Sequence, residues 1–360
     1  MGMVRMRVMM LGPSFAARGG MTSVSKIILS HDFADFEVEH LPTMHDNSIL
    51  GRLNHWAARI VSWPFRSVYK RPNVVHIHFA ERLSIWRKLS LMLLWRISRV
   101  PVVLHSHGAD TMDLYPKMWR VSKFLFKRFL RGSKKLIVLS ESWKDFYVRE
   151  VGLSEGMVEV LENPVILPDM FRTGDSEKIT ILYSGRIGRR KGAFDLIEAW
   201  RKIGSTNKER AELIIIGDGK IEEARNMVNE FGLEESCKVL GWVSEEEKNR
   251  ILSSSRIFIL PSFNEGLPMS LLEAMSYALA PIITPVGGIP NIIEEGVNGS
   301  FVVPGDADSI AAKLERMISD QEMAKVIGDN ARNSVHSLGI DEYGPKLERI
   351  WSNISLIGKG

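Results

Sequence analysis

The sequence predicts an α/β protein made of two doubly wound, Rossmann-like domains, and three observations support this prediction. The chain has 360 residues, more than one ordinary compact core requires. Short β-rich runs alternate with segments of helical periodicity, which is typical of βαβ units. Several runs, such as the Leu-Ile-Ile-Ile of residues 213–216, are apolar at every position, as expected for parallel strands buried on both faces.

The first predicted strand follows Arg5 and Arg7, a charge pattern that also begins secretory signal peptides. The apolar run 8–11 is too short for such a peptide, and Gly12 and Pro13 end it, so we expect a buried strand instead. The other elements of this half alternate between apolar runs of strand length and helical periods. Strands are expected at 6–11, 37–41, 73–78, 101–105 and 135–139, and helices at 20–30, 50–69, 83–98, 118–130 and 141–150.

The second half repeats this alternation after a break near residues 163–177, where prolines precede a polar segment at 173–176. Domains are therefore expected at 1–165 and 177–340, with a final helix at about 341–360 that crosses back onto the first domain. The uncharged stretch 274–293 contains three prolines and two glycines, so no transmembrane helix is expected. Strands are expected at 179–183, 212–216, 238–240, 256–260, 281–284 and 299–303, and helices at 192–202, 220–231, 245–253 and 268–277.

The composition excludes several classes of protein. Apolar residues make up 45% of the chain and charged residues 25%, so most of it is not disordered. The single cysteine, Cys237, excludes an internal disulfide framework and a cysteine metal cluster, and it favours a reducing compartment.

The net charge of +4 is unevenly distributed. Residues 50–135 contain 18 basic and 3 acidic residues together with five of the nine tryptophans. Three interpretations fit: helices with basic solvent faces, a nucleic-acid surface, or an anionic membrane surface that attracts Lys and Arg while Trp settles among the headgroups. So large an excess opposes folding by self-repulsion, which favours the membrane surface, and no nucleic-acid partner is expected.

Residues 265–275 read Glu-Gly-Leu-Pro-Met-Ser-Leu-Leu-Glu-Ala-Met and follow a predicted strand. Gly266 lets a ligand approach the backbone, and Pro268 suits a first helical turn. Glu265 would precede the helix and Glu273 would lie inside it, so both could reach one elongated ligand. The backbone N–H groups that would bind an anion are those of Leu267, Met269 and Ser270.

This segment resembles the E-x7-E signature of retaining nucleotide-sugar glycosyltransferases with the GT-B fold, and the chain is identified as a member of glycosyltransferase family 4. The resemblance implies two domains facing across a cleft and a nucleotide-diphosphate sugar as donor, a UDP-sugar above all. It also implies a glycan or lipid-linked acceptor in cell-surface polysaccharide or glycolipid synthesis, with no obligatory cofactor. Within this family, Glu265 would hold the sugar ring and Glu273 the ribose.

The loop 184–192 reads Ser-Gly-Arg-Ile-Gly-Arg-Arg-Lys-Gly and follows the first strand of the second domain. Cations at the start of a helix oppose its macrodipole unless an anion is bound there. The family resemblance implies that Arg186 and Lys191 contact the donor diphosphate. Other loops expected to border the donor contain Gly185, Gly217 and Val243.

Two segments of the first domain complete the resemblance. Gly19 and Gly20 precede the first helix, and in the family such a loop closes on the donor phosphate and the acceptor. Residues 105–110 read His-Ser-His-Gly-Ala-Asp, similar to the family's His-Gly-x-Asp segment, which implies that His107 contacts the donor sugar. His78 and Asp110 are expected on the acceptor side. The residues expected to be catalytic are therefore His107, Glu265, Arg186 and Lys191.

Metal sites are not expected. The H-x-H pairs at 76–78 and 105–107 could offer ligands, but there is no nearby cysteine and no clear third acidic ligand. Asp306 and Asp308 form a D-x-D pattern at the start of a helical period, where an N-cap and a first-turn acid are the better interpretation.

Two alternatives to a glycosyltransferase remain. One is a nucleotide-sugar epimerase on the same fold, and the other is a non-enzymatic module that binds nucleic acid or membrane through residues 50–135. For the transferase we expect a cytoplasmic location, peripheral at the inner membrane face.

Overall fold

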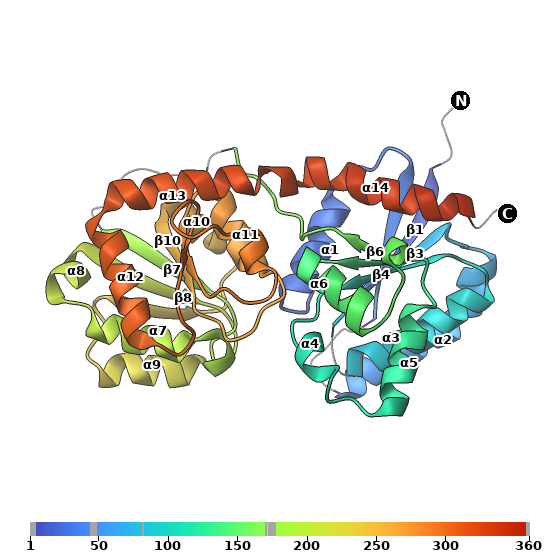
Figure 1. Ribbon diagram of the computed structural model, residues 1–360, viewed down its shortest axis with the longest axis horizontal. Helices are drawn as coiled ribbons and strands as arrows, with labels where there is room; N and C mark the ends of the chain where they lie inside the picture. The colour runs from blue at the N-terminus through green and yellow to red at the C-terminus, as the bar shows by residue number, and fades with distance from the viewer. Residues whose placement is uncertain (1–4, 44–48, 81–82, 170, 172–177, 358–360) are drawn as a thin grey trace. The chain divides into compact units, whose positions relative to one another are not determined.

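The computed structural model describes residues 5–43, 49–80, 83–169, 171 and 178–357 and separates the chain into two compact units (Figure 1). The amino-terminal unit comprises Met1–Pro164 and Leu338–Gly360, and the carboxy-terminal unit comprises Val165–Ser337. Each unit contains one six-stranded parallel sheet, which confirms the predicted fold class of two doubly wound domains. The polar segment 173–176 lies outside the described residues.

The sheet of the amino-terminal unit has the strand order β2-β1-β3-β4-β5-β6. Its strands are β1 (Met6–Gly12), β2 (Phe36–Pro42), β3 (Val74–Phe79), β4 (Val102–Ser106), β5 (Lys135–Val138) and β6 (Val158–Val160). Its helices are α1 (Gly20–Ser30), α2 (Ile49–Val68), α3 (Leu83–Ile97), α4 (Thr111–Leu114), α5 (Arg120–Leu130), α6 (Glu141–Asp145) and α14 (Ile340–Ile357), with a π-helical turn at Phe146–Glu150.

Alternate residues of these strands face two different layers of helices. Met9 and Ile77 belong to a core that includes residues of α3, α5 and α6. Helices α1 and α14 contact each other, and α14 also contacts β3, as Figure 1 shows. Trp351 of α14 is fully buried against Phe33 and Phe36. The last helix is thus part of the amino-terminal core.

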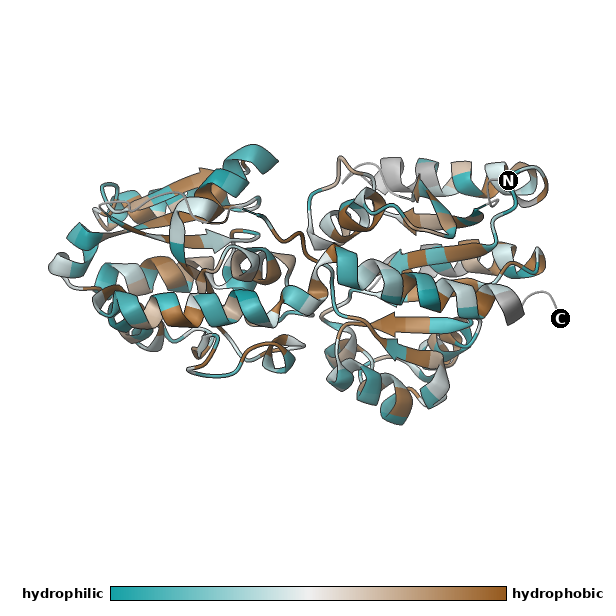
Figure 2. Ribbon diagram, turned by 90° about the horizontal axis from the view of Figure 1, so that it is seen from above, coloured by the Kyte–Doolittle hydropathy of each residue, from teal (hydrophilic) through white to brown (hydrophobic). Residues whose placement is uncertain are grey.

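The sheet of the carboxy-terminal unit has the strand order β12-β11-β10-β7-β8-β9. Its strands are β7 (Ile179–Ser184), β8 (Ala211–Ile216), β9 (Cys237–Gly241), β10 (Ser255–Leu260), β11 (Ala280–Ile283) and β12 (Ser300–Phe301). Its helices are α7 (Ala193–Lys202), α8 (Ser205–Arg210), α9 (Ile221–Glu230), α10 (Glu245–Ser254), α11 (Met269–Ser276), α12 (Ala307–Ser319) and α13 (Gln321–Ser334), and a 3-10 turn spans Arg189–Lys191. Figure 2 shows hydrophilic and hydrophobic residues alternating along the covering helices, as expected when one helix face packs on a sheet.

The structure adds elements that the sequence analysis did not predict, notably β6, α4, α8 and α13. Three of these contain only 3, 4 and 6 residues, which is too short for a periodic pattern. The interpretation of the D-x-D pattern is confirmed, because the carboxylate of Asp306 accepts hydrogen bonds from the N–H groups of Asp308 and Ser309. None of the helices in the described ranges combines the length and hydropathy that a membrane span requires.

Candidate active site

The loops that follow β7 and β8 are in close contact at the carboxyl edge of their sheet. The Gly185 N–H donates to the Ile216 carbonyl over 3.1 Å, and the Gly217 N–H donates to the Gly241 carbonyl over 2.8 Å. Gly217 has a φ of 146°, and a Cβ there would lie 1.8 Å from the Gly185 carbonyl oxygen. A glycine is therefore required for these loops to approach so closely, and the contact also brings the segment leading to Val243 beside them.

A second glycine contact joins the loops after β10 and β11. Gly287 has a φ of 60°, and a Cβ there would lie 1.9 Å from the Glu265 carbonyl oxygen. The Gly288 N–H donates to the Gly266 carbonyl over 2.6 Å. The backbone on both sides of the Glu265 side chain is thus fixed by the neighbouring loop.

Lys191 and Glu265 form a buried ion pair between the β7 and β10 loops. Their side chains are 15% and 6% exposed, and the Lys191 ammonium bonds Oε1 of the carboxylate. The surrounding backbone reinforces the contact. The Phe263 N–H donates to the Arg190 carbonyl over 2.9 Å, and the Arg190 guanidinium donates to the Asn264 carbonyl over 3.1 Å. Two residues expected in one site therefore meet directly.

Arg186 lies in the same loop with its guanidinium directed to solvent. Its side chain is 67% exposed, and Nη1 lies 3.5 Å from Oδ2 of Asp218, at the long end of an ion-pair distance. The hydroxyl of Tyr183 donates to the Arg186 carbonyl over 3.1 Å, which fixes the backbone. Burial, together with the Glu265 carboxylate, raises the pKa of Tyr183 well above its usual value, so this donor stays protonated at neutral pH.

Helix α11 begins at Met269, one residue later than predicted, with Pro268 as an extended N-cap residue. No side chain among the described residues caps this end. Because the first N–H groups of a helix lack intrahelical acceptors, those of Met269 and Ser270 suit an anionic ligand. The side chains of Leu267 and Met269 are buried, so this surface would offer a ligand mainly backbone atoms.

Glu273 contacts a residue that the sequence analysis missed. Its Oε1 lies 3.0 Å from Nζ of Lys248 on α10, and the two side chains are only 18% and 16% exposed. Lys248 also lies 2.7 Å from the largely exposed Glu245. Burial raises the pKa of Glu273, and Lys248 partly opposes that rise. In the sequence, Lys248 follows three glutamates and is indistinguishable from a surface i,i+3 partner of Glu245.

In the amino-terminal unit, the expected residues also gather at the carboxyl edge of the sheet. Strands β1, β3 and β4 are neighbours, and Gly19, His78 and His107 lie after or at their ends. Helix α1 begins at Gly20, and no side chain in the described part of the chain caps it. Asp110 is the N-cap residue of α4.

His107 is anchored on the strand next to its own. Its N–H donates to the Phe79 carbonyl over 2.9 Å, and its Nε2 lies 2.8 Å from Nδ1 of His78. Burial lowers the pKa of His107 to about 3, with smaller contributions from His76 and Lys88, so its ring is neutral at neutral pH. His78 itself is 0% exposed, so a ligand would meet His107 before it met His78.

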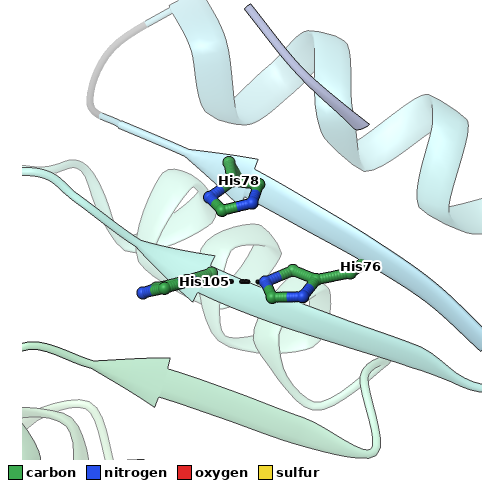
Figure 3. A group of neighbouring side chains, drawn as sticks. All are labelled: His76, His78 and His105. Carbon is green, nitrogen blue, oxygen red and sulfur yellow. Dashed lines mark hydrogen bonds between the residues drawn. The ribbon is translucent and has the colours of Figure 1, made fainter. Parts of the chain in front are cut away.

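The register of β3 and β4 places His78 directly opposite His105. As a result, His76, His78 and His105 bring three ring nitrogens within 4.8 Å of one another (Figure 3). In the sequence the two H-x-H pairs are 29 residues apart, and neither showed a clear third ligand. Register between strands distant in sequence, which no local pattern specifies, accounts for this difference.

Two family models match successive parts of the chain. Residues 9–167 match the model described as Glycosyltransferase Family 4, and residues 169–334 match the model described as Glycosyl transferases group 1. Together they span the sheets of both units.

Individual relatives agree with these models. An uncharacterized glycosyltransferase of Methanocaldococcus jannaschii, MJ1607, is 32% identical over 182 residues, which are 50% of this chain and 43% of that protein. A UDP-Gal:alpha-D-GlcNAc-diphosphoundecaprenol alpha-1,3-galactosyltransferase of Escherichia coli is 26% identical over 73% of this chain and 70% of its own length. The crystal structure of Anabaena HepE in complex with UDP has a TM-score of 0.75 at 17% identity, covering 97% of this chain and 100% of that one, which shows a common fold.

Proposed function

The chain belongs to glycosyltransferase family 4, and we propose that it is a retaining enzyme that transfers a sugar from a UDP-sugar to a glycan or lipid-linked acceptor in cell-surface polysaccharide or glycolipid synthesis. The observation that carries this proposal is the contact between Lys191 and Glu265 beside Arg186 and the start of α11. Cations and helix N–H groups suit a diphosphate, and a carboxylate beside them suits sugar hydroxyls.

The diphosphate would bind where positive charge is already fixed. Arg186 has a weak partner and a mostly exposed guanidinium, which can turn to a phosphate at little cost. Lys191 carries three N–H donors, so it can keep Glu265 while it donates to a second oxygen. The N–H groups of Met269 and Ser270 add the positive end of a helix dipole. All of these groups stabilise the charge that develops on the departing diphosphate.

Other predicted residues would hold the sugar and the nucleoside. Glu265 would accept hydrogen bonds from the sugar ring, Glu273 would accept from the ribose, and His107 would contact the sugar with a neutral imidazole. We assign no protein nucleophile: the leaving phosphate would assist attack by the acceptor hydroxyl on the same face. Backbone atoms around the donor would come from Gly19, Gly20, Gly185, Gly217, Val243, Gly266, Leu267 and Pro268. Asp110 would face the acceptor.

Because Arg186 and Lys191 supply the charge that a metal supplies elsewhere, we expect transfer to survive chelation with EDTA.

A thermal-shift panel of UDP-, GDP- and ADP-sugars tests the donor. At a ligand concentration 100 times Kd the stabilisation is about 2.7 kcal/mol, an easily measured shift. Arg186→Ala and Lys191→Ala should each weaken UDP-sugar binding about 10–100-fold, because each removes a charge-assisted hydrogen bond of about 1.5–3 kcal/mol. Lys325→Ala, which removes an exposed cation from α13, is the matched control. Full transfer activity in both site variants would refute the proposal, and conversion of the donor to another sugar nucleotide without acceptor would indicate an epimerase.

We further propose that the amino-terminal unit binds an anionic membrane surface through exposed stripes on α2 and α5. On α5, Arg120, Phe124 and Arg128 follow one another at a spacing of four residues and are exposed. At the end of α2, Phe65 and the next residue after the helix, Tyr69, stack with ring centroids 5.0 Å apart and are 57% and 74% exposed. Such large exposed aromatics beside arginines suit the headgroup region.

The two helices that carry these stripes both pack against α3. Helices α2 and α3 are in contact, and a Cβ on Gly132, just after α5, would lie 2.6 Å from the Met92 side chain of α3. Ile97 at the end of α3 and Trp119 before α5 are also exposed, at 71% and 82%. The relative from Escherichia coli is named for an acceptor linked to diphosphoundecaprenol, which supports a lipid-linked acceptor here. A peripheral location at the cytoplasmic face would follow.

Vesicle sedimentation tests this surface. We expect the protein to bind vesicles that contain phosphatidylglycerol, and to bind them less as salt is raised. Arg120→Glu together with Arg128→Glu should weaken binding at least about 30-fold, at about 1 kcal/mol for each arginine lost near the leaflet. Lys325→Glu in the other unit should change it little. Absence of binding at low salt would refute the membrane proposal and leave the donor site untouched.

A further inference from the structure

Four histidines form two hydrogen-bonded pairs at the ends of β3 and β4. Nε2 of His76 lies 3.2 Å from Nδ1 of His105, the pair that Figure 3 joins with a dashed line. Nδ1 of His78 lies 2.8 Å from Nε2 of His107. His76, His78 and His105 are 0% exposed, so these ring contacts are shielded from water.

The ring geometry favours hydrogen bonds over metal coordination. The rings of His76 and His78 are inclined by only 7° with centroids 4.6 Å apart, and those of His78 and His105 by 30°. Nitrogen lone pairs lie in the ring plane, so stacked rings direct them side by side. A metal ion requires ligands that converge from different directions.

Trp351 determines the proton positions of the first pair. Its indole N–H can only donate, and it donates to Nδ1 of His76 over 3.2 Å. His76 must therefore carry its proton on Nε2 and donate to Nδ1 of His105. The C-terminal helix thus sets the tautomer of His76 and places the proton of His105 on Nε2, which is buried without a hydrogen-bond partner among the described residues.

The second pair has no indole donor, but the surroundings of His78 decide its tautomer. Nε2 of His78 is buried and has no hydrogen-bond partner among the described residues. A second buried N–H without an acceptor, beside that of His105, would be less favourable than a buried acceptor without a donor, so the proton of His78 belongs on Nδ1. The backbone carbonyl of His78 accepts from the Lys88 ammonium, which fixes the strand end. His78 thus donates to Nε2 of His107.

We propose that His78 is a positioning residue: its Nδ1–H holds Nε2 of His107 and leaves His107 with its proton on Nδ1, as the donor that substrate meets. This inference rests on the proposed function, in which His107 contacts the transferred sugar. A ring held through one nitrogen presents the other in one orientation, and a displacement of about 1 Å in such a group can cost about 100-fold in rate.

The proton positions can be measured without any substrate. In protein labelled with ¹⁵N-histidine, long-range ¹H–¹⁵N correlation spectra distinguish a protonated ring nitrogen from an unprotonated one. We expect His107 to show a protonated Nδ1 and an unprotonated Nε2, and expect His78→Leu to mix the two tautomers. A protonated Nε2 on His107 in the wild-type protein, or a His107 spectrum unaffected by His78→Leu, would overturn the inference.

Kinetics provide the second test, as hydrolysis or transfer of whichever UDP-sugar the thermal-shift panel selects. His78→Leu should lower kcat about 10–100-fold with the KM for donor nearly unchanged, because the diphosphate groups are untouched. His78→Asn can place an amide N–H where Nδ1 was and should restore much of the rate. His76→Leu breaks the other pair and controls for a merely structural loss.

The outcomes separate the two ideas. Equal losses in His76→Leu and His78→Leu, or a His78→Leu enzyme with wild-type kcat, would reject the positioning role. If no UDP-sugar binds or reacts with the wild-type protein, the proposed function fails, and the spectra still decide whether His78 sets the tautomer of His107.

Discussion

Lys248→Met should destabilise the carboxy-terminal unit in a way that depends strongly on pH. Nζ of Lys248 lies 3.0 Å from Oε1 of Glu273, and both side chains are less than one fifth exposed. Removing one partner of a buried pair costs about 3–5 kcal/mol. Since both groups here retain some access to water, we expect about 2–3 kcal/mol at pH 8. Methionine keeps most of the volume, so little of this cost reflects a cavity.

The sign of the pH dependence follows from Glu273. Burial already raises its pKa in the folded protein, with Lys248 opposing. A carboxyl with a raised folded pKa lowers stability as pH rises from its unfolded value, near 4.5, through its folded value. Without Lys248 the pKa of Glu273 in the folded protein rises further, so the pH range over which stability falls becomes wider. The cost of Lys248→Met should therefore be small near pH 4.5 and grow toward pH 8.

Neighbouring groups do not interfere in this range. Glu245, 2.7 Å from Lys248, is 74% exposed, so water can solvate its carboxylate when the lysine is removed. Burial raises the pKa of Tyr277, so this phenol stays neutral. The pKa of Lys248 is lowered by burial but raised overall by Glu273 and Glu245, so it titrates above the range measured.

Urea unfolding between pH 4.5 and 8 is the assay, with hydrogen exchange of peptides from α10 and α11 to assign the transition to the correct unit. The double variant Lys248→Met/Glu273→Gln should return to within about 1 kcal/mol of wild type, because no buried charge is left alone. The control is Lys313→Met, whose partner Glu295 is 45% exposed, and we expect it to cost less than about 1 kcal/mol. A cost of Lys248→Met that is the same at every pH would refute the reasoning.

Two further predictions follow from close packing. Gly217→Ala should lower stability by about 1–3 kcal/mol and weaken UDP-sugar binding, because its Cβ would lie 1.8 Å from the Gly185 carbonyl oxygen. Gly188→Ala, in the adjoining loop after β7 with nothing within 4 Å of its Cβ, should do neither in the same thermal-shift assay. Trp351→Ala should cost about 3–5 kcal/mol of the amino-terminal unit's stability in urea, since the indole is 0% exposed, and Trp119→Ala, at an 82% exposed residue, should cost almost nothing. An unaltered unfolding midpoint in Trp351→Ala would contradict the packing described for α14.

The sequence was sufficient to predict the sheets because each long strand can be recognised from its own residues. A run such as 213–216 is apolar at every residue and requires burial on both faces, whatever the rest of the chain does. The same holds for the residues at strand ends, since Arg186 and Glu265 follow strands that any parallel sheet aligns at one edge. Short elements such as β6, with 3 residues, contain too few residues for a recognisable pattern.

Contacts between side chains on different elements could not be predicted from the sequence. Lys248 reaches Glu273 because α10 contacts β7 while α11 contacts β10, the strand beside it, and nothing in a Glu-Glu-Glu-Lys run distinguishes this from a solvent pair. His78 looked like a ligand contact because it ends a strand, yet the structure buries it behind His107. Both cases depend on which face of a neighbouring element a side chain meets, and that choice is made by tertiary packing.

The chain passes between its two units twice, after residue 164 and after residue 337, and returns to complete the first unit with α14. During synthesis the amino-terminal sheet must therefore wait for the last 23 residues before Trp351 can cover Phe33 and supply the N–H that His76 accepts. A polypeptide released before α14 is made could fold its second unit, but its first unit would be incomplete. The exposed apolar surface of that unit would be bound by chaperones or cleaved by proteases. Any attempt to produce the first unit alone would need α14 joined back to residue 164, as in a circular permutation, because simple truncation removes part of its core.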